Sequence, residues 1–488
     1  MPTYEPVIGL EVHAELQTTS KMFCGCPVVD LTAASPNTAV CEICTGMPGT
    51  LPVINRRAVE YALRVAAALH CSISEISVFA RKNYFYPDLP KGYQISQYEL
   101  PLAEHGWLTI QAGTSPRQIP IRRVHLEEDT GKLFHREGCS LVDFNRSGVP
   151  LLEIVSEPAM HSVEEAKAYA VALRSLVRYL GVNSGDMEKG VMRFEANISV
   201  RPTGSTDLRT RTEVKNLNSF RAMERAIEFE VKRQIDLLSQ GEPVIQETMG
   251  WDDSTGETYP QRSKEEAHDY RYFPEPDLPP LKVELEWLKS IEDSLPELPD
   301  QKIDRYEQEL GLSRYQAGII AQEKEVASYF EEAAAAGVDV SPSVLANWLT
   351  GEVFSILHQE DQDISSISFS PLHLVELVQM VESGHINQTT AKAVLAAIFA
   401  SGESPVSYVE AHNLAQINDP DTLLTLVQDT FKANPAQVEE YLAGKHSLAQ
   451  WFFGQVMRAT DGRANPAVLK QILDTALSQL DDGRPDAG

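Results

Sequence analysis

The first part of the chain, from Tyr4 to about Val283, alternates hydrophobic and polar positions in short runs. Gly, Pro and Asn residues separate these runs, as is typical between β-strands, and few segments show a helical period. We therefore predict a domain of the α+β class that is built on a large mixed or antiparallel sheet.

Two segments of this part carry the period of an amphipathic helix. The first begins at Ser162, a favourable N-cap, with Glu165 three residues later, and the second begins at Asn218 and Ser219. Apolar residues recur every three or four positions, so each helix should bury one side. The expected buried positions are Val163, Ala166, Ala170, Leu173, Leu176 and Val177 in the first helix, and Phe220, Met223, Ile227, Val231, Ile235 and Leu238 in the second.

Proline marks the end of this part. Segments 273–280 and 295–300 each contain several prolines, so we predict that neither is helix nor central strand and that they form a semi-rigid boundary. The chain beyond is rich in Ala and Leu, and a joint near 401–405 should divide it. Its helices are expected to begin at Ser341-Pro342, Ser370-Pro371 and Asp419-Pro420.

Composition places the chain among globular proteins, with 43% hydrophobic and 23% charged residues. No apolar run reaches the ~20 residues that span a bilayer, and residues 1–6 lack the pattern of an export signal. We therefore expect a cytoplasmic protein without a membrane partner. The net charge of -28 argues against nonspecific binding to DNA or RNA, because that attraction comes from Lys and Arg. We expect no DNA partner, and any RNA contact should be local and led by shape.

Four of the six cysteines form two close pairs, Cys24 with Cys26 and Cys41 with Cys44. Four thiolates suit tetrahedral zinc and leave no open position for a substrate, so we interpret them as a structural zinc site. The alternative of four unrelated thiols stays open, because the first pair is C-x-C rather than C-x-x-C.

Carboxylates and imidazoles recur on one face of several predicted strands. In the first strand Glu11, His13 and Glu15 share a face opposite Ile8, Leu10 and Val12, because side chains alternate along a strand. Such oxygen-rich sets hold Mg²⁺ together with substrate phosphate. A solvated strand face is the alternative.

The same arrangement appears further along the chain. The spacing of His125, Glu127 and Asp129 places them on one face, with Glu128 opposite. Glu153 stands inside an apolar strand, where a carboxylate is costly unless it is paired or bound to a metal. A further alternating segment aligns Arg193, Glu195, Asn197, Ser199 and Arg201. We predict that these strands form a concave polar surface.

The second predicted helix offers free N–H groups at its start, with Lys215 beside them, which would attract phosphate. Asn216 and Asn218 in the same segment are candidate nucleotide-binding residues. An ordinary capped helix with a solvated lysine is the alternative. The chain lacks the phosphate-loop, dinucleotide-binding, kinase and nucleophile-elbow motifs, so any ATP must bind to an unusual sheet.

Several long motifs closely resemble the family of B subunits of bacterial glutamyl/aspartyl-tRNA amidotransferases, and the resemblance covers essentially the whole chain. The motifs are IGLEVH at 8–13, RKNYFYPD at 81–88, YQISQ at 93–97, HLEED at 125–129, VKNLNSF at 214–220, DYRYFPEPD at 269–277 and FGQVM at 453–457. The resemblance implies a cradle domain that binds ATP and the aminoacyl end of tRNA, followed by helical and tail domains. We place these domains at residues 1–295, 296–405 and 406–488.

The resemblance also implies an activity and partners. The enzymes of this family are glutamine-hydrolysing carbon–nitrogen ligases. Their B subunit uses ATP to phosphorylate the side-chain carboxylate of Glu on Glu-tRNA(Gln) or of Asp on Asp-tRNA(Asn). Ammonia from an amidase (glutaminase) subunit then forms Gln-tRNA(Gln) or Asn-tRNA(Asn), and a third, small polypeptide bridges the two in a heterotrimer. Two rivals remain, namely a noncatalytic tRNA-binding scaffold and a stand-alone phosphohydrolase.

Site residues follow from the same resemblance. It implies Glu11, His13 and Glu128 as the first magnesium ligands, with Glu153 and Glu195 next. Spacing favours Glu127 over Glu128, unless a β-bulge reverses the parity; we rank Glu128 first. The expected phosphate-binding lysines are Lys82, Lys91 and Lys215, and the expected tyrosines that stack on the terminal adenosine are Tyr84, Tyr86 and Tyr93.

Overall fold

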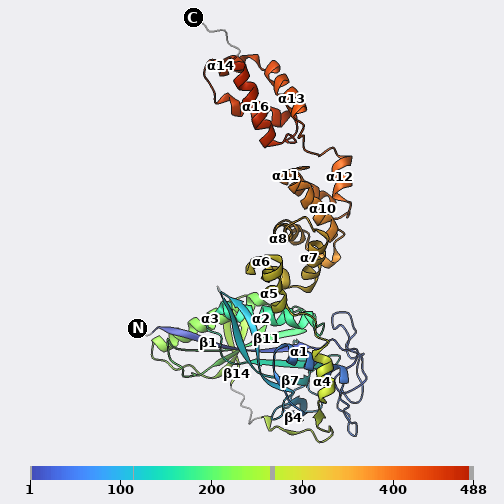
Figure 1. The fold of residues 1–488 in the computed structure, drawn as a ribbon. Helices are drawn as coiled ribbons and strands as arrows, with labels where there is room; N and C mark the ends of the chain where they lie inside the picture. Colours follow the sequence, from blue (N-terminus) through green and yellow to red (C-terminus); the bar gives the residue numbers. More distant parts are fainter. Residues whose placement is uncertain (1–2, 114, 264–269, 483–488) are drawn as a thin grey trace. The chain divides into compact units, whose positions relative to one another are not determined.

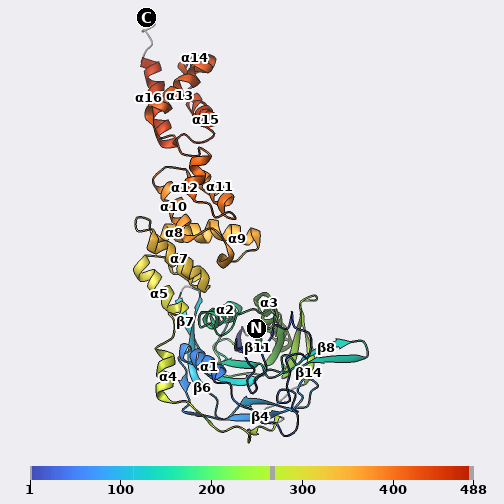
Figure 2. The same ribbon diagram turned by 90° about the vertical axis from the view of Figure 1, so that its right-hand side faces the viewer.

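The computed structural model describes residues 3–113, 115–263 and 270–482, so Asp269 of the DYRYFPEPD motif lies outside the described residues. The chain divides into two compact units (Figures 1 and 2). The first comprises Met1–Ile303 with Gln322–Lys324, and the second comprises Asp304–Ala321 with Glu325–Gly488.

Nine of the described strands form one mixed sheet in the first unit, which confirms the predicted class. Their order is β14 (Glu257–Ser263), β13 (Glu247–Asp252), β12 (Thr212–Leu217), β11 (Met192–Pro202), β1 (Tyr4–Glu15), β10 (Pro150–Ser156), β7 (Ser115–Glu128), β6 (Ala103–Ala112) and β2 (Ser72–Ile73). Only the pairing of β12 with β13 is parallel, and the other neighbours run antiparallel.

Three helices cover the apolar side of the sheet, and Figures 1 and 2 show two of them, α2 and α3, side by side. These helices are α1 (Arg56–Ala68), α2 (Val163–Tyr179) and α3 (Phe220–Ser239). Ile8, Leu10 and Val12 of β1 are fully buried in the core that they share with these helices. The alternation predicted for the first strand is therefore confirmed.

The start of α2 follows the prediction, because the Ser162 hydroxyl accepts a hydrogen bond from the Glu165 backbone N–H at 3.1 Å. Five of its six expected stripe positions are buried, and Val163 is partly exposed. In α3 the inner face turns away from the expected Ile235 and Leu238. The buried positions of α3 are Ala222, Met223, Ala226, Ile227, Glu230 and Gln234.

Shorter strands form three small sheets. The first joins β15 (Phe273–Pro274), β4 (Phe79–Asn83) and β5 (Tyr93–Gln97), and β5 packs on β7 of the large sheet. The others pair β16 (Leu281–Lys282) with β3 (Ile76–Ser77), and β8 (Lys132–Arg136) with β9 (Cys139–Asp143). β15 lies at a sheet edge, where a proline leaves no ladder hydrogen bond unmade.

The proline-rich boundary is partly helical, which corrects one prediction. After α4 (Leu285–Glu292), helix α5 (Pro299–Leu310) begins at Pro299, inside the segment 295–300 that we expected to be free of helix. Proline fits the first position of a helix, because the N–H that it lacks would have no partner in the helix there.

The second unit consists of helices, and the expected starts at Pro342, Pro371 and Pro420 are confirmed. The helices are α6 (Arg314–Ala321), α7 (Lys324–Ala336), α8 (Pro342–Trp348), a π-helix (Leu349–Val353), α9 (Phe354–Glu360), a 3-10 helix (Ile364–Ser366), α10 (Pro371–Glu382), α11 (Gln388–Ile398), α12 (Pro405–Ala411), α13 (Pro420–Ala433), α14 (Pro435–Leu442), α15 (Leu448–Ala459) and α16 (Pro466–Asp482).

Helix α12, which follows the predicted joint at 401–405, packs against α10 and α11. Helices α13 to α16 share a separate apolar core around Phe452 and Val456. No described helix combines the length and the apolar character needed to cross a membrane.

Candidate active site

The large sheet aligns polar side chains from neighbouring strands on the side opposite the helices. Strand β1 lies between β11 and β10, and its pairing places His13 beside both Arg193 and Glu153. Glu153 in turn pairs with His125 of β7. In the adjacent row Glu11 stands beside Glu195. We call this side, which carries Glu11, His13, Glu127, Glu153, Glu195 and Glu213, the acidic face.

The first cluster of the acidic face is the His13 group, made of His13, Glu127 and Glu153. The Nε2 atom of His13 lies 3.6 Å from Glu127 Oε1 and 3.4 Å from Glu153 Oε2. His125 Nε2 approaches the same Glu153 oxygen at 3.3 Å. The potential ligand atoms of His13, Glu127 and Glu153 lie within 4.8 Å of one another, so the His13 group has the donors and the spacing of a cation site.

Protonation within the His13 group reflects its crowded carboxylates. Burial lowers the pKa of His13, but hydrogen bonding and charge from Glu153 outweigh burial and raise this pKa to about 9. Burial raises the pKa of Glu153, yet His125 and His13 hold it well below its usual range. Burial and the charge of Glu153 raise the pKa of Glu127. In the absence of a metal ion, a proton on His13 therefore balances part of the negative charge.

The second cluster is the Glu11 group, made of Glu11, Glu195 and Glu213. Lys215 Nζ lies 2.9 Å from Glu195 Oε2 and 3.4 Å from Glu213 Oε1. Burial raises the pKa of Glu195, but Lys215 outweighs burial and holds it at about 2. For Glu11, burial and the charges of neighbouring glutamates raise the pKa to about 7. This group also has the donors of a cation site.

Glu127 and Glu128 face different partners. The pairing of β7 with β10 stays in register from Glu128 to Arg123, so strict alternation holds and Glu127 joins His13. The Glu128 carboxylate instead pairs with Lys91 and accepts the Ile95 backbone N–H at 2.9 Å. The structure therefore does not bring Glu128 into the His13 group, and its role as a metal ligand stays a prediction.

Lys82 lies above the acidic face on β4. Burial lowers its pKa, but nearby tyrosines and the carboxylates of Glu127 and Glu153 raise the pKa above the ordinary lysine value. Its ammonium lies 4.9 Å from the ring centroid of Tyr270, and Tyr270 packs edge-on against both Tyr84 and Tyr272. A permanent cation thus faces the carboxylates from an aromatic wall.

The other residues expected to bind nucleotide lie in varied settings. Tyr86 is half exposed, and Tyr93 lies under the Arg81 guanidinium at 4.2 Å. Asn216 and Asn218 are exposed, and Asn216 adopts a left-handed conformation with φ of 65°. Ser219 caps α3 by accepting the Ala222 N–H at 3.0 Å. Binding of a nucleotide by these residues stays a prediction.

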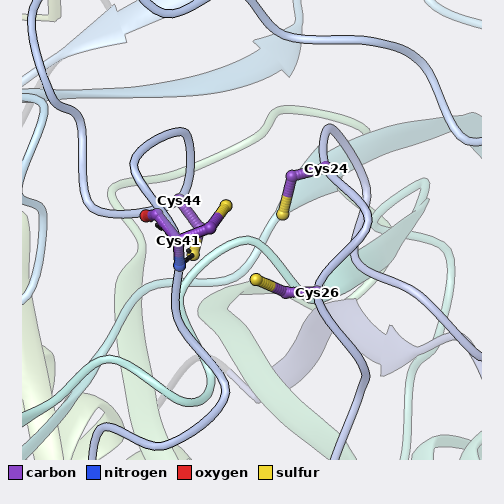
Figure 3. A group of neighbouring side chains, drawn as sticks. All are labelled: Cys24, Cys26, Cys41 and Cys44. Carbon is purple, nitrogen blue, oxygen red and sulfur yellow. Dashed lines mark hydrogen bonds between the residues drawn. The ribbon is translucent and has the colours of Figure 1, made fainter.

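The cysteine quartet converges from two loops, and Figure 3 shows the side chains of Cys24 and Cys26 facing those of Cys41 and Cys44. Their sulfur atoms lie within 4.8 Å of one another, which fits four ligands of one metal ion. Hydrogen bonding from Cys24 is the largest influence that lowers the pKa of Cys44, to about 4, although burial raises it. Lys21 Nζ, 3.6 Å from this sulfur, adds positive charge. The quartet can hold a metal ion.

Comparison with known proteins identifies the family. A family model described as the GatB/GatE catalytic domain matches residues 6–289, and one described as a GatB domain matches residues 328–477. A relative from Thermodesulfovibrio yellowstonii is 50% identical, covering 98% of this chain and 100% of the relative. Another, from Persephonella marina, is 47% identical, covering 97% and 99%. Both are named as the B subunit of an aspartyl/glutamyl-tRNA(Asn/Gln) amidotransferase.

The chain belongs to this family of amidotransferase B subunits. The match to the catalytic domain of the family contains the whole acidic face, Lys82 and the cysteine quartet. The sites that the sequence pattern marked therefore lie in the domain that the family model describes as catalytic.

Glu213 belongs to the acidic face of this protein but was not predicted from the sequence. The sequence pattern could have indicated it, because Thr212 and Val214, which are buried, alternate along the strand with Glu213 and Lys215. Tyr270 and Tyr272 were also missed as the aromatic wall beside Lys82, because they stand far along the chain from it. The pairing of β15 with β4, together with hydrogen bonds from Asn83 to the Tyr270 and Arg271 carbonyls, brings that segment to Lys82.

Proposed function

We propose that this chain activates the side-chain carboxylate of Glu in Glu-tRNA(Gln), of Asp in Asp-tRNA(Asn), or of both, by phosphorylating it with ATP, and then converts it to an amide with ammonia. Membership of the family makes the chain a subunit of a tRNA-dependent amidotransferase, a ligase of protein biosynthesis. The observation that carries the proposal is the convergence of the His13 and Glu11 groups on one sheet face.

The proposed reaction has two steps, since a free carboxylate is a poor electrophile. First, a carboxylate oxygen of the aminoacyl group attacks the γ-phosphorus of ATP, and ADP leaves with the bonding electron pair. Ammonia then attacks the acyl carbon, phosphate leaves, and the nitrogen loses a proton to give the amide. Both steps accumulate negative charge on phosphoryl oxygens, so positive groups near the phosphates lower the barrier.

Residues of this chain can supply those positive groups. Lys82 and Lys215 are held beside the two carboxylate groups, and each has its pKa raised above the ordinary lysine value. Burial lowers both pKa values, but Tyr272 and nearby carboxylates outweigh burial at Lys82, and carboxylates outweigh it at Lys215. They would neutralise and orient phosphate oxygens. His13 lies between Glu127 and Glu153, which fix the orientation of its ring.

A divalent cation fits the same face, because oxygen-rich donors gather there within coordinating reach of one another. We assign Mg²⁺ to this face, with His13, Glu127 and Glu153 as ligands of one ion and Glu11, Glu195 and Glu213 around a second position. Glu128 remains a candidate ligand by family resemblance. When bound, Mg²⁺ would neutralise charge on the phosphoryl oxygens.

We assign structural Zn²⁺ to the cysteine quartet, because four thiol ligands leave no open coordination position for a substrate. By family resemblance we also propose an amidase subunit and a small bridging subunit as partners in a heterotrimer. The acceptor end of tRNA would reach the cradle domain, 1–295, and the tail domain at 406–488, which follows the helical domain at 296–405, would contact the elbow of the tRNA. We place the complex in the cytoplasm.

Measurement of ATP hydrolysis tests this function and separates its rivals. The chain, purified with its amidase partner, should hydrolyse ATP when Glu-tRNA(Gln) or Asp-tRNA(Asn) is added, but not with the same tRNA uncharged. Equal hydrolysis without tRNA would favour a stand-alone phosphohydrolase. Binding of tRNA without any hydrolysis would favour a noncatalytic scaffold. Either result would overturn the proposal.

A further inference from the structure

A fully buried lysine, Lys21, lies beside the cysteine quartet. It is 0% exposed, although lysines are almost never fully buried unless they are paired. Its Nζ atom donates one hydrogen bond to Cys44 Sγ at 3.6 Å and another to the Phe144 carbonyl at 3.2 Å. Among the described residues no carboxylate lies within ion-pair distance of Lys21, and Glu128 pairs with Lys91 instead. The sulfur is therefore the contact that can supply a negative charge.

A buried ammonium without a counter-charge is unfavourable. Moving a lysine charge out of water costs several kcal/mol unless an opposite charge and hydrogen bonds replace the lost solvent. A neutral thiol is only a weak acceptor and carries no charge, whereas a metal-bound cysteine is a thiolate. Four thiolates around a divalent ion leave the cluster with a surplus of negative charge. The buried lysine and a metal-loaded quartet therefore each supply the charge that the other lacks.

The second contact of this ammonium joins the quartet to residues 143–149, which we call the bridging loop. The Ser147 hydroxyl of this loop donates to the Cys44 carbonyl at 3.0 Å. On its other side, the Gly148 N–H donates to the Asp129 carbonyl at 2.9 Å, directly beyond the end of β7. Because β7 contributes to the acidic face, the bridging loop connects the quartet with one end of that face.

We propose that Lys21 is the internal counter-ion of the metal-loaded quartet and fastens the loaded quartet to the bridging loop. This inference rests on the proposed zinc site and names the residue that balances its charge. Lys21 is not part of the acidic face, so it acts as a positioning residue rather than a catalytic one. Its removal should change the affinity for the metal, the electronic state of the bound sulfur and the order of the bridging loop.

Zinc binding to the full chain tests the counter-ion. Lys21→Met should bind zinc about 10- to 100-fold more weakly in competition with a chromophoric chelator, the usual loss when a partner of a metal ligand is removed. Methionine is unbranched and adaptable, so it should fill the space of the lysine stem. Lys189→Met is the matched control and should bind zinc normally, because Lys189 is exposed and lies 3.6 Å from Asp30, between the two cysteine pairs.

A spectrum tests the contact between the ammonium and the sulfur. With Co²⁺ in place of zinc, the thiolate-to-metal charge-transfer band of Lys21→Met should move to longer wavelength, because loss of the hydrogen bond and the positive charge raises the energy of the sulfur electrons. An unchanged band would rule out the contact. Lys21→Gln keeps an N–H donor without the charge, so its zinc affinity should fall below that of the wild type. Wild-type affinity in Lys21→Gln would rule out a counter-ion.

Unfolding with and without zinc separates this role from simple packing. A lysine that only fills space would contribute equally to the free energy of unfolding in both forms, and its removal would leave zinc affinity unchanged. A counter-ion should stabilise the loaded form by more, since zinc that binds more weakly also stabilises the native chain less. Equal losses in the two forms would contradict the proposal. Lys21→Gln serves in the same comparison if Lys21→Met fails to fold.

Hydrogen exchange tests the link to the bridging loop. In zinc-saturated Lys21→Met the amides of residues 143–149 should exchange faster than in the wild type, because the loop loses its hydrogen bond from the ammonium. The amides of α16, in the second unit, should not change and serve as the internal control. Wild-type protection throughout the loop would mean that Lys21 does not fasten it.

The failures are distinguishable. A wild-type chain that binds no zinc would overturn the zinc assignment and this proposal with it. Equal zinc affinity in the wild type and Lys21→Met would overturn the counter-ion alone and leave the zinc assignment intact. ATP hydrolysis in the presence of misacylated tRNA tests the proposed reaction separately, and its absence from a chain that binds zinc normally would overturn that reaction without affecting Lys21.

Discussion

Two polar clusters in the first unit, one partly buried and one fully buried, differ in how their carboxylates are neutralised. On the acidic face the carboxylates of Glu11, Glu195 and Glu213 crowd together. Burial and the charges of neighbouring glutamates raise the pKa of Glu11 to about 7. The face therefore holds more negative charge than its own cations neutralise.

Between α3 and the sheet, a single carboxylate, Glu230, is surrounded by donors. It accepts hydrogen bonds from Thr212 at 2.6 Å, from Gln234 at 2.9 Å and from Arg233 at 2.8 and 2.9 Å. Burial raises the pKa of Glu230, but Arg233 and the other donors outweigh burial and lower it below the ordinary carboxyl value.

The Glu11 group keeps a surplus of negative charge that a bound ligand could neutralise, whereas the Glu230 network already has a donor for its carboxylate oxygens. A buried network whose hydrogen bonds are all made stabilises the fold, whereas a surplus of like charge at a partly buried face is tolerated where a cation or substrate neutralises it. Removal of a side chain from the acidic face should therefore lower the enzymatic activity. Removal of one from the Glu230 network should lower the free energy of unfolding.

The largest effect is expected from His13→Ala on the acidic face. Loss of this ligand should lower the rate of amide formation by about a thousandfold, or roughly 4 kcal/mol of transition-state stabilisation. Binding of tRNA and partners should persist. The measurement is single-turnover formation of Gln-tRNA or Asn-tRNA, and His135→Ala on the exposed hairpin serves as the control. A loss of less than tenfold would remove His13 from the reaction.

The cysteine quartet is a second crowded group of ionisable side chains, and we expect it to stabilise the fold rather than to take part in the reaction. We expect Cys24→Ser to reduce bound zinc from about one equivalent to near zero. The free energy of unfolding should fall by about 3 kcal/mol, since metal binding stabilises the loops that it joins. Elemental analysis and thermal unfolding measure both changes, with Cys139→Ser as the exposed control. Full metal content in Cys24→Ser would contradict the assignment.

The Glu230 network should show the reverse of the acidic face. We expect Glu230→Gln to lower the free energy of unfolding by about 2 kcal/mol, because charge-assisted hydrogen bonds are lost, while turnover changes little. The depressed pKa makes this contribution complete above the ordinary carboxyl value of 4.5. It is then lost as the pH falls through the lower value in the folded state. Denaturant unfolding at pH 7 and near pH 3 should show the gap between wild type and variant closing at acid pH.

Much of this arrangement follows from local sequence. Alternation in β1, β7 and β11 identified the faces of Glu11, His13 and Glu195, since side-chain parity depends only on the strand itself. The same parity favoured Glu127 over Glu128, and the structure places Glu127 with His13.

What depends on distant pairing could not be predicted. The partnership of Glu128 with Lys91 requires β5 to pack on β7, and no local pattern specifies that contact. The inner face of α3 was misjudged for a related reason. Glu230 and Gln234 look like surface residues until Thr212 of β12 is placed beside them.

The smallest effect is expected at the start of α2, where the Ser162 hydroxyl accepts the Glu165 N–H at 3.1 Å without the ion pairs that reinforce Glu230. Ser162→Ala should lower the free energy of unfolding by about 1 kcal/mol, half the loss expected for Glu230→Gln. Ser162→Gly, which suits an N-cap better than alanine, should restore most of the loss. A cost for Ser162→Ala equal to that of Glu230→Gln would mean that charge contributes nothing to the α3 network, and the contrast with the acidic face would then rest on burial alone.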